Sequence, residues 1–221
     1  MKFYFQLLTT VLILLIITPS HAADYSGGFL IGYSGGTGFH LNGTISHFAP
    51  TLPLKMQLGV AYARMNPGKA DDARKIFIND ATNGEPEKSG KNWDFRLDFL
   101  YQIQVLGMSD AYLYGGPRYS KFTGNFKYIG GNEDFNITCN QWGWGIGTIS
   151  YFPMNKTLDF VLTGGFDYYL SGILVGHDTQ YSPDGENVNP RRDFDYGDAD
   201  KAVNQPKYEL RLMMGINWKF K

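Results

Sequence analysis

Apolar and polar residues alternate along the last stretch of the chain, Tyr208–Phe220. Every second residue there is apolar, and the residues between are mostly charged, polar or small; the apolar set is Tyr208, Leu210, Leu212, Met214, Ile216, Trp218 and Phe220. Because side chains alternate sides along a strand, one face of this segment is apolar and the other is polar. The segment is long for a soluble strand but fits a tilted strand crossing a bilayer, which needs about 9–11 residues. We therefore predict a transmembrane β-strand.

The same alternation predicts seven further strands. They are Gly28–Ser34, Gly38–Phe48, Leu54–Arg64, Asn92–Gln104, Asp110–Lys127, Cys139–Phe152 and Thr157–Ser171. The first two flank Gly35-Gly36-Thr37, which is typical of a tight hairpin. One long kinked strand over Gly28–Phe48 is the alternative, but it leaves an odd number of strands. Single-chain bacterial barrels have even numbers, which favours two strands.

The predicted connections alternate in length. Those at 49–53, 105–109 and 153–156 are short, whereas those at 65–91, 128–138 and 172–206 are long, with the hairpin at 35–37 as the exception. Bacterial outer-membrane barrels show this asymmetry, with short periplasmic turns and long external loops. Within the first long connection, Ala70–Asn79 is predicted as a short helix with Ala73, Ile76 and Phe77 on one side.

The N-terminal stretch, residues 1–22, has the pattern of a secretory signal peptide. One basic residue, Lys2, precedes an apolar core from Val11 to Ile17, and Ser20-His21-Ala22 places small residues at the positions that signal peptidase requires. The apolar core is too short for a spanning helix, so an uncleaved anchor is the weaker alternative. We expect cleavage after Ala22, which leaves residues 23–221 as one barrel domain.

Composition supports a barrel and excludes other classes. Aromatic residues make up 16% of the chain and 27 residues are glycine, which suits aromatic belts on the lipid face and glycine-rich turns. The only cysteine, Cys139, excludes an intramolecular disulfide. A net charge of −1 gives no basis for nucleic-acid binding. The predicted fold class is therefore all-β: a closed, antiparallel, eight-stranded transmembrane β-barrel with up-and-down meander order.

The spacing of Gly215, Trp218 and Phe220 resembles the C-terminal assembly signal of bacterial outer-membrane barrels. The whole pattern resembles the small eight-stranded barrels of the OmpA transmembrane-domain and OmpX type. The resemblance is one of architecture and implies a bacterial outer-membrane location. It implies as partners the lipid bilayer, lipopolysaccharide and the barrel-assembly machinery, and it transfers no function.

Ten charged residues are predicted to point into the barrel: Lys55, Asp94, Arg96, Asp98, Arg118, Asp159, Asp167, Glu209, Arg211 and Lys219. A turn centred on Gly107 sets Arg96 opposite Arg118, with Asp94 and Asp98 diagonal to Arg118. A plugging salt-bridge network is the main interpretation, because buried charges require partners. A proton relay or gated ion path is the alternative. Inward glycines on two strands either leave a cavity or seat neighbouring aromatic rings.

Catalytic and metal sites find little support. Some small barrels modify lipid A with a His-x-Ser pair, and none of the four histidines is followed by serine at that spacing; Ser46 and His47 point to opposite faces. The carboxylates of Asp193, Asp195, Asp198 and Asp200 are a candidate calcium site, although a solvated acidic loop is the simpler interpretation. We expect no catalytic residues, no cofactor and no other metal site.

Two functions fit these features best. The first is a non-enzymatic surface protein that serves envelope integrity or binds an unknown external partner through residues 65–91 and 172–206. The second is a narrow channel or carrier for a small or hydrophobic solute, as in the OmpW type, which requires an open lumen. A lipid-A-modifying enzyme comes third.

Overall fold

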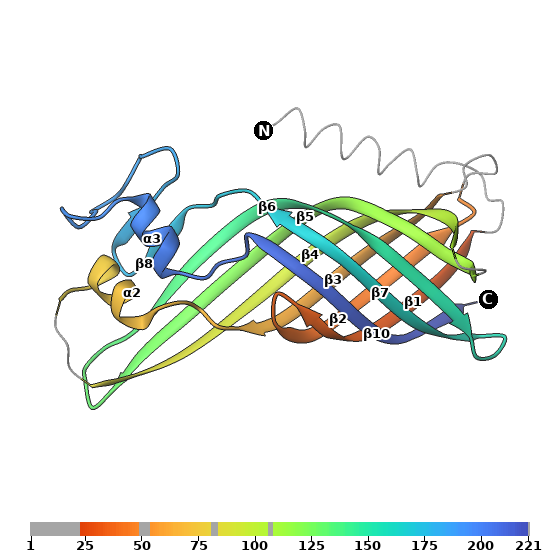
Figure 1. Ribbon diagram of the computed structural model, residues 1–221, viewed down its shortest axis with the longest axis horizontal. Coiled ribbons are helices and arrows are strands. Elements are labelled where there is room, and N and C mark those ends of the chain that lie inside the picture. The colour runs from red at the N-terminus through yellow and green to blue at the C-terminus, as the bar shows by residue number, and fades with distance from the viewer. Residues whose placement is uncertain (1–22, 49–53, 81–83, 106–107, 221) are drawn as a thin grey trace.

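The computed structural model describes residues 23–48, 54–80, 84–105 and 108–220 (Figure 1). The predicted signal peptide, the turn at 49–53 and the middle of the turn at 105–109 lie outside the described residues. Eight antiparallel strands form a closed barrel: β1 (Asp24–Ser34), β2 (Thr37–Ser46), β3 (Leu54–Met65), β4 (Glu85–Val105), β5 (Met108–Ile129), β6 (Asp134–Pro153), β7 (Leu158–Tyr169) and β10 (Tyr208–Phe220).

The strand order follows the sequence around the barrel, and β1 pairs with β10 to close it. The predicted fold class is thus confirmed, and so is the division of residues 28–48 into two strands, joined at Gly35 and Gly36. Gly35 has a φ of +64°, which a tight hairpin requires and which side chains disfavour. Among the described residues, no helix is long and apolar enough to span a membrane.

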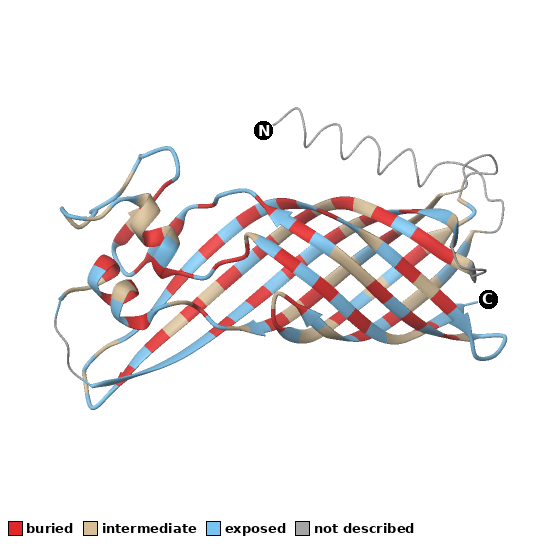
Figure 2. Cartoon of the chain, viewed as in Figure 1, coloured by how far each residue is buried: buried red, intermediate tan, exposed pale blue. Residues whose placement is uncertain are grey.

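Buried and exposed residues alternate along the strands, as the banding in Figure 2 shows. In β10 the apolar set is mostly exposed on the outer wall, with Leu212 at 59% exposure, whereas Glu209, Arg211 and Met213 are buried inside. The predicted facing of β5 is also confirmed, because Leu113 points outward and Arg118 is fully buried.

The predicted boundaries of two long connections are wrong. Residues 85–91 belong to β4 rather than to a loop, and residues 128–138 form only a short turn between Ile129 and Asp134. The sequence Glu85–Lys91 lacks the alternating apolar residues that mark a strand; its strand conformation comes from pairing with β5. The long β4, β5 and β6 extend beyond the rest of the barrel at the end away from the C-terminus (Figure 1).

Four smaller elements cover this extension: α2 (Ala70–Phe77), β8 (Leu174–Gly176), β9 (Thr179–Tyr181) and α3 (Tyr196–Ala202). The first lies within the predicted helix 70–79, and its buried side includes Ala73, Ile76 and Phe77 as predicted. We call these four elements, together with the ends of β5 and β6 against which they pack, the cap. The alternation of short and long connections predicts that the end with both chain termini is the periplasmic rim; on that prediction the cap lies at the external end.

Candidate functional site

The pairing of β4 with β5 sets two arginines side by side inside the barrel. Arg96 lies opposite Arg118 in the register, as the turn geometry predicted. Both guanidinium groups are fully buried. Like charges in directly opposed positions destabilise a sheet unless other groups neutralise them.

Asp167 of β7 reaches across the barrel and joins the two arginines. Arg96 donates two hydrogen bonds to it, from Nη1 to Oδ2 at 2.9 Å and from Nη2 to Oδ1 at 2.9 Å. Arg118 Nε donates to the same carboxylate at 3.0 Å. A bidentate pair of this kind is among the stronger polar contacts in proteins, so Asp167 links strands on opposite sides of the lumen.

Two further aspartates complete this cluster, which we call the arginine network. Arg96 Nη1 donates to Asp94 at 2.6 Å, and Arg118 Nη2 donates to Asp98 at 2.7 Å. Two cations therefore meet three carboxylates. Inward Gly145 makes room for them, since a Cβ there would overlap Oδ1 of Asp167. Gly145 thus leaves space for charged groups. Gly147 leaves space for an aromatic ring, because a Cβ there would meet the hydroxyl of Tyr114.

A second inward group lies on β10 and β2. Arg211 Nη2 lies 2.6 Å from Nδ1 of His40, a residue that sequence reasoning did not include in the site. The sequence contained the information needed to include it, because His40 lies on the polar face of its strand together with Asn42 and Thr44. Glu209 is buried beside Gly35, and its Oε1 has no hydrogen-bond partner among the described residues.

The remaining predicted charges lie toward the periplasmic end. Lys219 Nζ contacts Asp159 at 2.7 Å, and Asn217 donates to the same carboxylate at 3.3 Å. Lys55 instead places Nζ over the ring of Tyr112, 4.1 Å from its centroid. An open pocket of about 310 Å³ at the barrel mouth has Lys55, Asp159, Asn217 and Lys219 among its lining residues. The ten predicted inward charges thus fall into three groups rather than one.

Apolar side chains fill the level between the pocket and the arginine network. This cluster contains Leu30, Leu100, Tyr112, Tyr114, Ile149, Tyr151, Val161 and Met213. A cavity beside Leu30 and His40 measures only about 10 Å³, at the lower limit of about 10–15 Å³ that one water needs. The described side chains therefore close the barrel in cross-section.

The cap has an apolar core of its own. Phe77 of α2 packs on Tyr181 of β9 with ring centroids 5.3 Å apart, and Tyr181 donates to the carbonyl of Ile76 at 3.2 Å. Phe122 and Phe126 of β5 belong to the same cluster. Arg74 forms a salt bridge with Glu133 in the turn after β5. Sequence reasoning missed this core, because its residues come from several separate segments.

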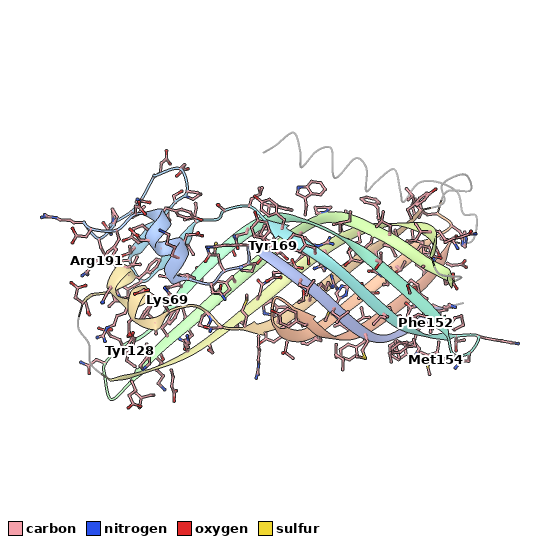
Figure 3. All side chains as sticks on the ribbon, in the orientation of Figure 1. Lys69, Tyr128, Phe152, Met154, Tyr169 and Arg191 are labelled. Carbon is pink, nitrogen blue, oxygen red and sulfur yellow. The ribbon has the colours of Figure 1, made fainter. Side chains whose placement is uncertain are left out.

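Two titratable groups in the cap are held neutral. Burial, helped by a hydrogen bond to Asp71 at 3.1 Å, raises the pKa of Tyr128 to about 12. Burial raises the pKa of the Cys139 thiol to about 12 as well. Neither Tyr128 nor Cys139 is therefore poised for chemistry near neutral pH. Figure 3 shows Tyr128 at the external end and Phe152 and Met154 at the periplasmic end.

The candidate calcium site is not formed. Asp195 and Asp198 make a capping box at the start of α3, in which Asp195 accepts from the Asp198 amide at 3.0 Å. Asp200 pairs with Lys207 at 2.7 Å, and Asp193 joins neither group. Across the described ranges no three His, Cys, Asp or Glu residues converge in a way that suits a metal ion.

The residues of the proposed assembly signal lie on β10. Trp218 and Phe220 are exposed on the outer wall near the periplasmic rim, with exposed fractions of 42% and 58%. Gly215 packs directly on β1, because a Cβ there would overlap the carbonyl oxygen of Phe29. Their role in assembly stays a prediction.

Aromatic rings mark the other membrane boundary. Phe39, Tyr62 and Trp93 lie on successive strands, with centroid separations of 5.6 Å and 4.9 Å between neighbours. Further around the wall Tyr119 and Trp142 are 4.9 Å apart, and Tyr168 and Tyr208 are 5.1 Å apart. We call these seven residues the external aromatic belt. Such belts sit at the level of the lipid headgroups.

A solved outer-membrane protein shares this architecture. A major outer membrane protein from Thermus thermophilus is similar at 26% identity with a TM-score of 0.70, covering 90% of this chain and 100% of that one. Ail of Yersinia pestis (14% identity, TM-score 0.45, 90% and 97% covered) and CarO2 of Acinetobacter baumannii (12%, 0.45, 90% and 98%) also match. No family model and no curated protein matches the sequence.

Three observations point to the same location for the chain. They are the closed eight-stranded meander, the apolar outer wall between two levels of aromatic residues, and the similarity to the Thermus protein. The chain is an outer-membrane β-barrel protein.

Proposed function

We propose that this protein is a non-enzymatic, non-conducting barrel that carries a folded cap as its functional surface. The cap holds α2 within residues 65–91 and β8, β9 and α3 within residues 172–206, the two segments expected to contact an external partner. The observation that carries the proposal is the closure of the lumen by the arginine network and by the apolar level beneath it. A barrel filled in this way supports a surface domain but offers no path for a solute.

The filled interior argues against the channel alternative. An ion or solute would have to break the contacts of Asp167 with both arginines. The Asp167 carboxylate would then be buried without a cation, and Arg96 and Arg118 would keep only Asp94 and Asp98.

An enzymatic role finds no support in the geometry. His47 contacts Asp24 at 2.7 Å, but the hydroxyl of Ser46 donates to the Asp24 carbonyl at 3.4 Å rather than to the imidazole. A serine nucleophile needs its base within hydrogen-bond reach.

Planar bilayer recordings test this proposal. The purified protein should insert without unitary current steps, and the Arg96→Ala variant should lose stability rather than gain conductance. Steps in the wild type that are altered in Arg96→Ala would instead establish a conducting lumen. Deleting residues 177–195, which removes β9 and with it Tyr181 of the cap core, should leave the bilayer without current steps as well.

We also propose that residues 1–22 are removed on export, and that Trp218 and Phe220 promote assembly of residues 23–221 into the barrel by the assembly machinery. Intact-mass measurement of the membrane form should give a chain that starts at Ala23. A mass that includes Met1 would contradict cleavage.

A further inference from the structure

Three neighbouring strands repeat one pattern at the external membrane boundary. On β3 the outward residues run Val60, Tyr62, Arg64; on β4 they run Phe95, Trp93, Lys91; on β5 they run Pro117, Tyr119, Lys121. Each strand thus goes from apolar to aromatic to cationic in the external direction. Two residues of a strand span roughly 7 Å, so the cations lie just outside the aromatic belt.

These cations are confined to one sector of the wall. Beyond the belt, β6 continues with Asn140 and β7 with Leu170, and the β1–β2 hairpin ends at Gly35 and Gly36. Arg64, Lys91 and Lys121 are exposed, and none forms a salt bridge with another part of the described chain.

Two of the cations lie in directly opposed positions. Arg64 faces Lys91 across the β3–β4 ladder, and such cross-strand neighbours have Cβ atoms about 4.5–5.5 Å apart. The next outward positions on β4 are Ser89 and Trp93, and Thr123 lies opposite Lys91 on β5, so no carboxylate adjoins the pair. Inside the barrel the opposed pair Arg96 and Arg118 is neutralised by three aspartates, whereas this outer pair has no anion from the described chain.

An apolar groove of about 600 Å³ lies directly below the cations on the lipid-facing wall. Small and branched side chains form its floor, and Trp142 stands at one side; the floor includes Leu41, Gly43, Leu58, Val60, Leu97 and Pro117. A Cβ added at Gly43 would meet no atom within 4 Å, so the space above this glycine is open. The volume lies in the range of about 300–1,000 Å³ that holds organic ligands.

From this arrangement we propose that the β2–β6 sector of the wall binds a phosphorylated glycolipid of the lipid A type. One acyl chain would fill the groove, and the phosphates would lie between Arg64, Lys91 and Lys121. The groove opens to hydrocarbon, so its occupant has to be apolar, and the exposed cations favour an anion at headgroup level. Lys121 Nζ lies 5.9 Å from the ring centroid of Phe95, which lines the groove, so the cationic and apolar parts of the site adjoin. Arginine and lysine are suited to phosphate oxygens in this role.

A second copy of the chain is the less suitable occupant. A two-fold symmetric contact brings the same patch of both copies together. Arg64, Lys91 and Lys121 of two copies would then face each other without an intervening acid, which opposes association.

Native mass spectrometry in detergent micelles with diphosphoryl lipid A tests the proposal. The wild type should retain the lipid, and the Lys91→Gln/Lys121→Gln variant should bind it roughly tenfold or more weakly, given the worth of each cation near an anionic surface. Lys127→Gln/Lys156→Gln removes the same charge away from the groove, at the outer tip of β5 and in the turn before β7, and should bind like the wild type. Gly43→Leu fills the groove and should also weaken retention.

The arms of the experiment separate the alternatives. The same lipid without phosphate should bind weakly to every variant, and inorganic phosphate should compete poorly because it cannot use the groove. Equal retention by the two double variants, strong binding of the dephosphorylated lipid, or a dominant dimer would each overturn the proposal. Heat-modifiable gel migration confirms that each variant is folded before it is compared.

Discussion

The inner faces of β5 and β6 differ sharply on the two sides of the external aromatic belt. Within the membrane, the inner residues of β5 include Gly116, Arg118 and Ser120, and the two polar ones bond to partners inside the lumen. Beyond the belt, the same face continues as Phe122 and Phe126 and packs under the helices of the cap. The alternation of inner and outer side chains along β5 continues without a break. Within the membrane its inner face carries the polar residues, and beyond the belt its inner face is apolar.

The difference follows from where water and lipid lie. Inside the bilayer the outer face contacts hydrocarbon, so polar groups can be placed only in the lumen. Outside the bilayer the outer face is wet, as the exposed Asn136 and Thr138 of β6 show, and apolar groups gather under the cap. One continuous sheet therefore holds the arginine network and the apolar core of the cap in series. The following substitutions test whether the two cores are energetically separate.

Asp167→Ala should give the largest effect. It removes the carboxylate that both arginines share and leaves two buried cations opposed, at a cost of about 3–5 kcal/mol in the free energy of unfolding. Urea titration followed by heat-modifiable gel migration measures this loss. Asp193→Ala, an exposed aspartate without a salt bridge among the described residues, is the control and should unfold like the wild type. A wild-type midpoint for Asp167→Ala would show that the arginine network contributes nothing.

Phe77→Ala should destabilise the cap alone, by about 3 kcal/mol, because a buried ring is lost from its core. Limited proteolysis should then cut residues 172–206 faster while the barrel keeps its heat-modifiable migration. Lys75→Ala, on the exposed side of the same helix, serves as the control. If the barrel unfolds together with the cap in Phe77→Ala, the two cores form one cooperative unit.

Arginine substitutions on the outer wall should locate the boundary between the two regions. Leu212→Arg places a charge in the lipid-facing band and should cost about 2 kcal/mol or more. Asn136→Arg places it on the wet outer face of β6 and should cost almost nothing. Folding titrations into lipid vesicles compare the two variants. Similar costs at both positions would mean that the membrane reaches further along β6 than the aromatic belt indicates.

The rate at which Cys139 reacts with maleimide is the prediction with the smallest expected effect. Its side chain is 1% exposed, and burial raises its pKa to about 12, so little thiolate forms at neutral or mildly alkaline pH. Impermeant maleimide should label it far more slowly than a cysteine introduced at Asp193. Labelling should accelerate in Phe77→Ala, which loosens the cap core around it. Rapid labelling in the wild type would show that the cap opens on its own.

The barrel could be predicted from sequence because lipid on one side forces a strict alternation, which β10 displays almost without exception. The opposition of Arg96 and Arg118 followed from counting back from a turn. Asp167 could not be assigned as their common partner, because it comes from a strand across the lumen and local spacing holds no information on that contact. The apolar core of the cap could not be predicted for a related reason. Its residues come in small numbers from α2, β5, β6, β9 and α3, and only the fold brings them together.

The uninterrupted β5–β6 ladder also has a mechanical consequence. Its register runs from Lys127 paired with Asp134 to Ala111 paired with Ser150, without a linker between the membrane region and the cap. A pull on the cap along the strands would load the hydrogen bonds of this ladder in shear, many at once, rather than opening them one after another. A ligand that tethers the cell through the cap would therefore transmit force directly into the barrel wall, and the weak points under load would be the shorter contacts of β8 and α3 rather than the anchor.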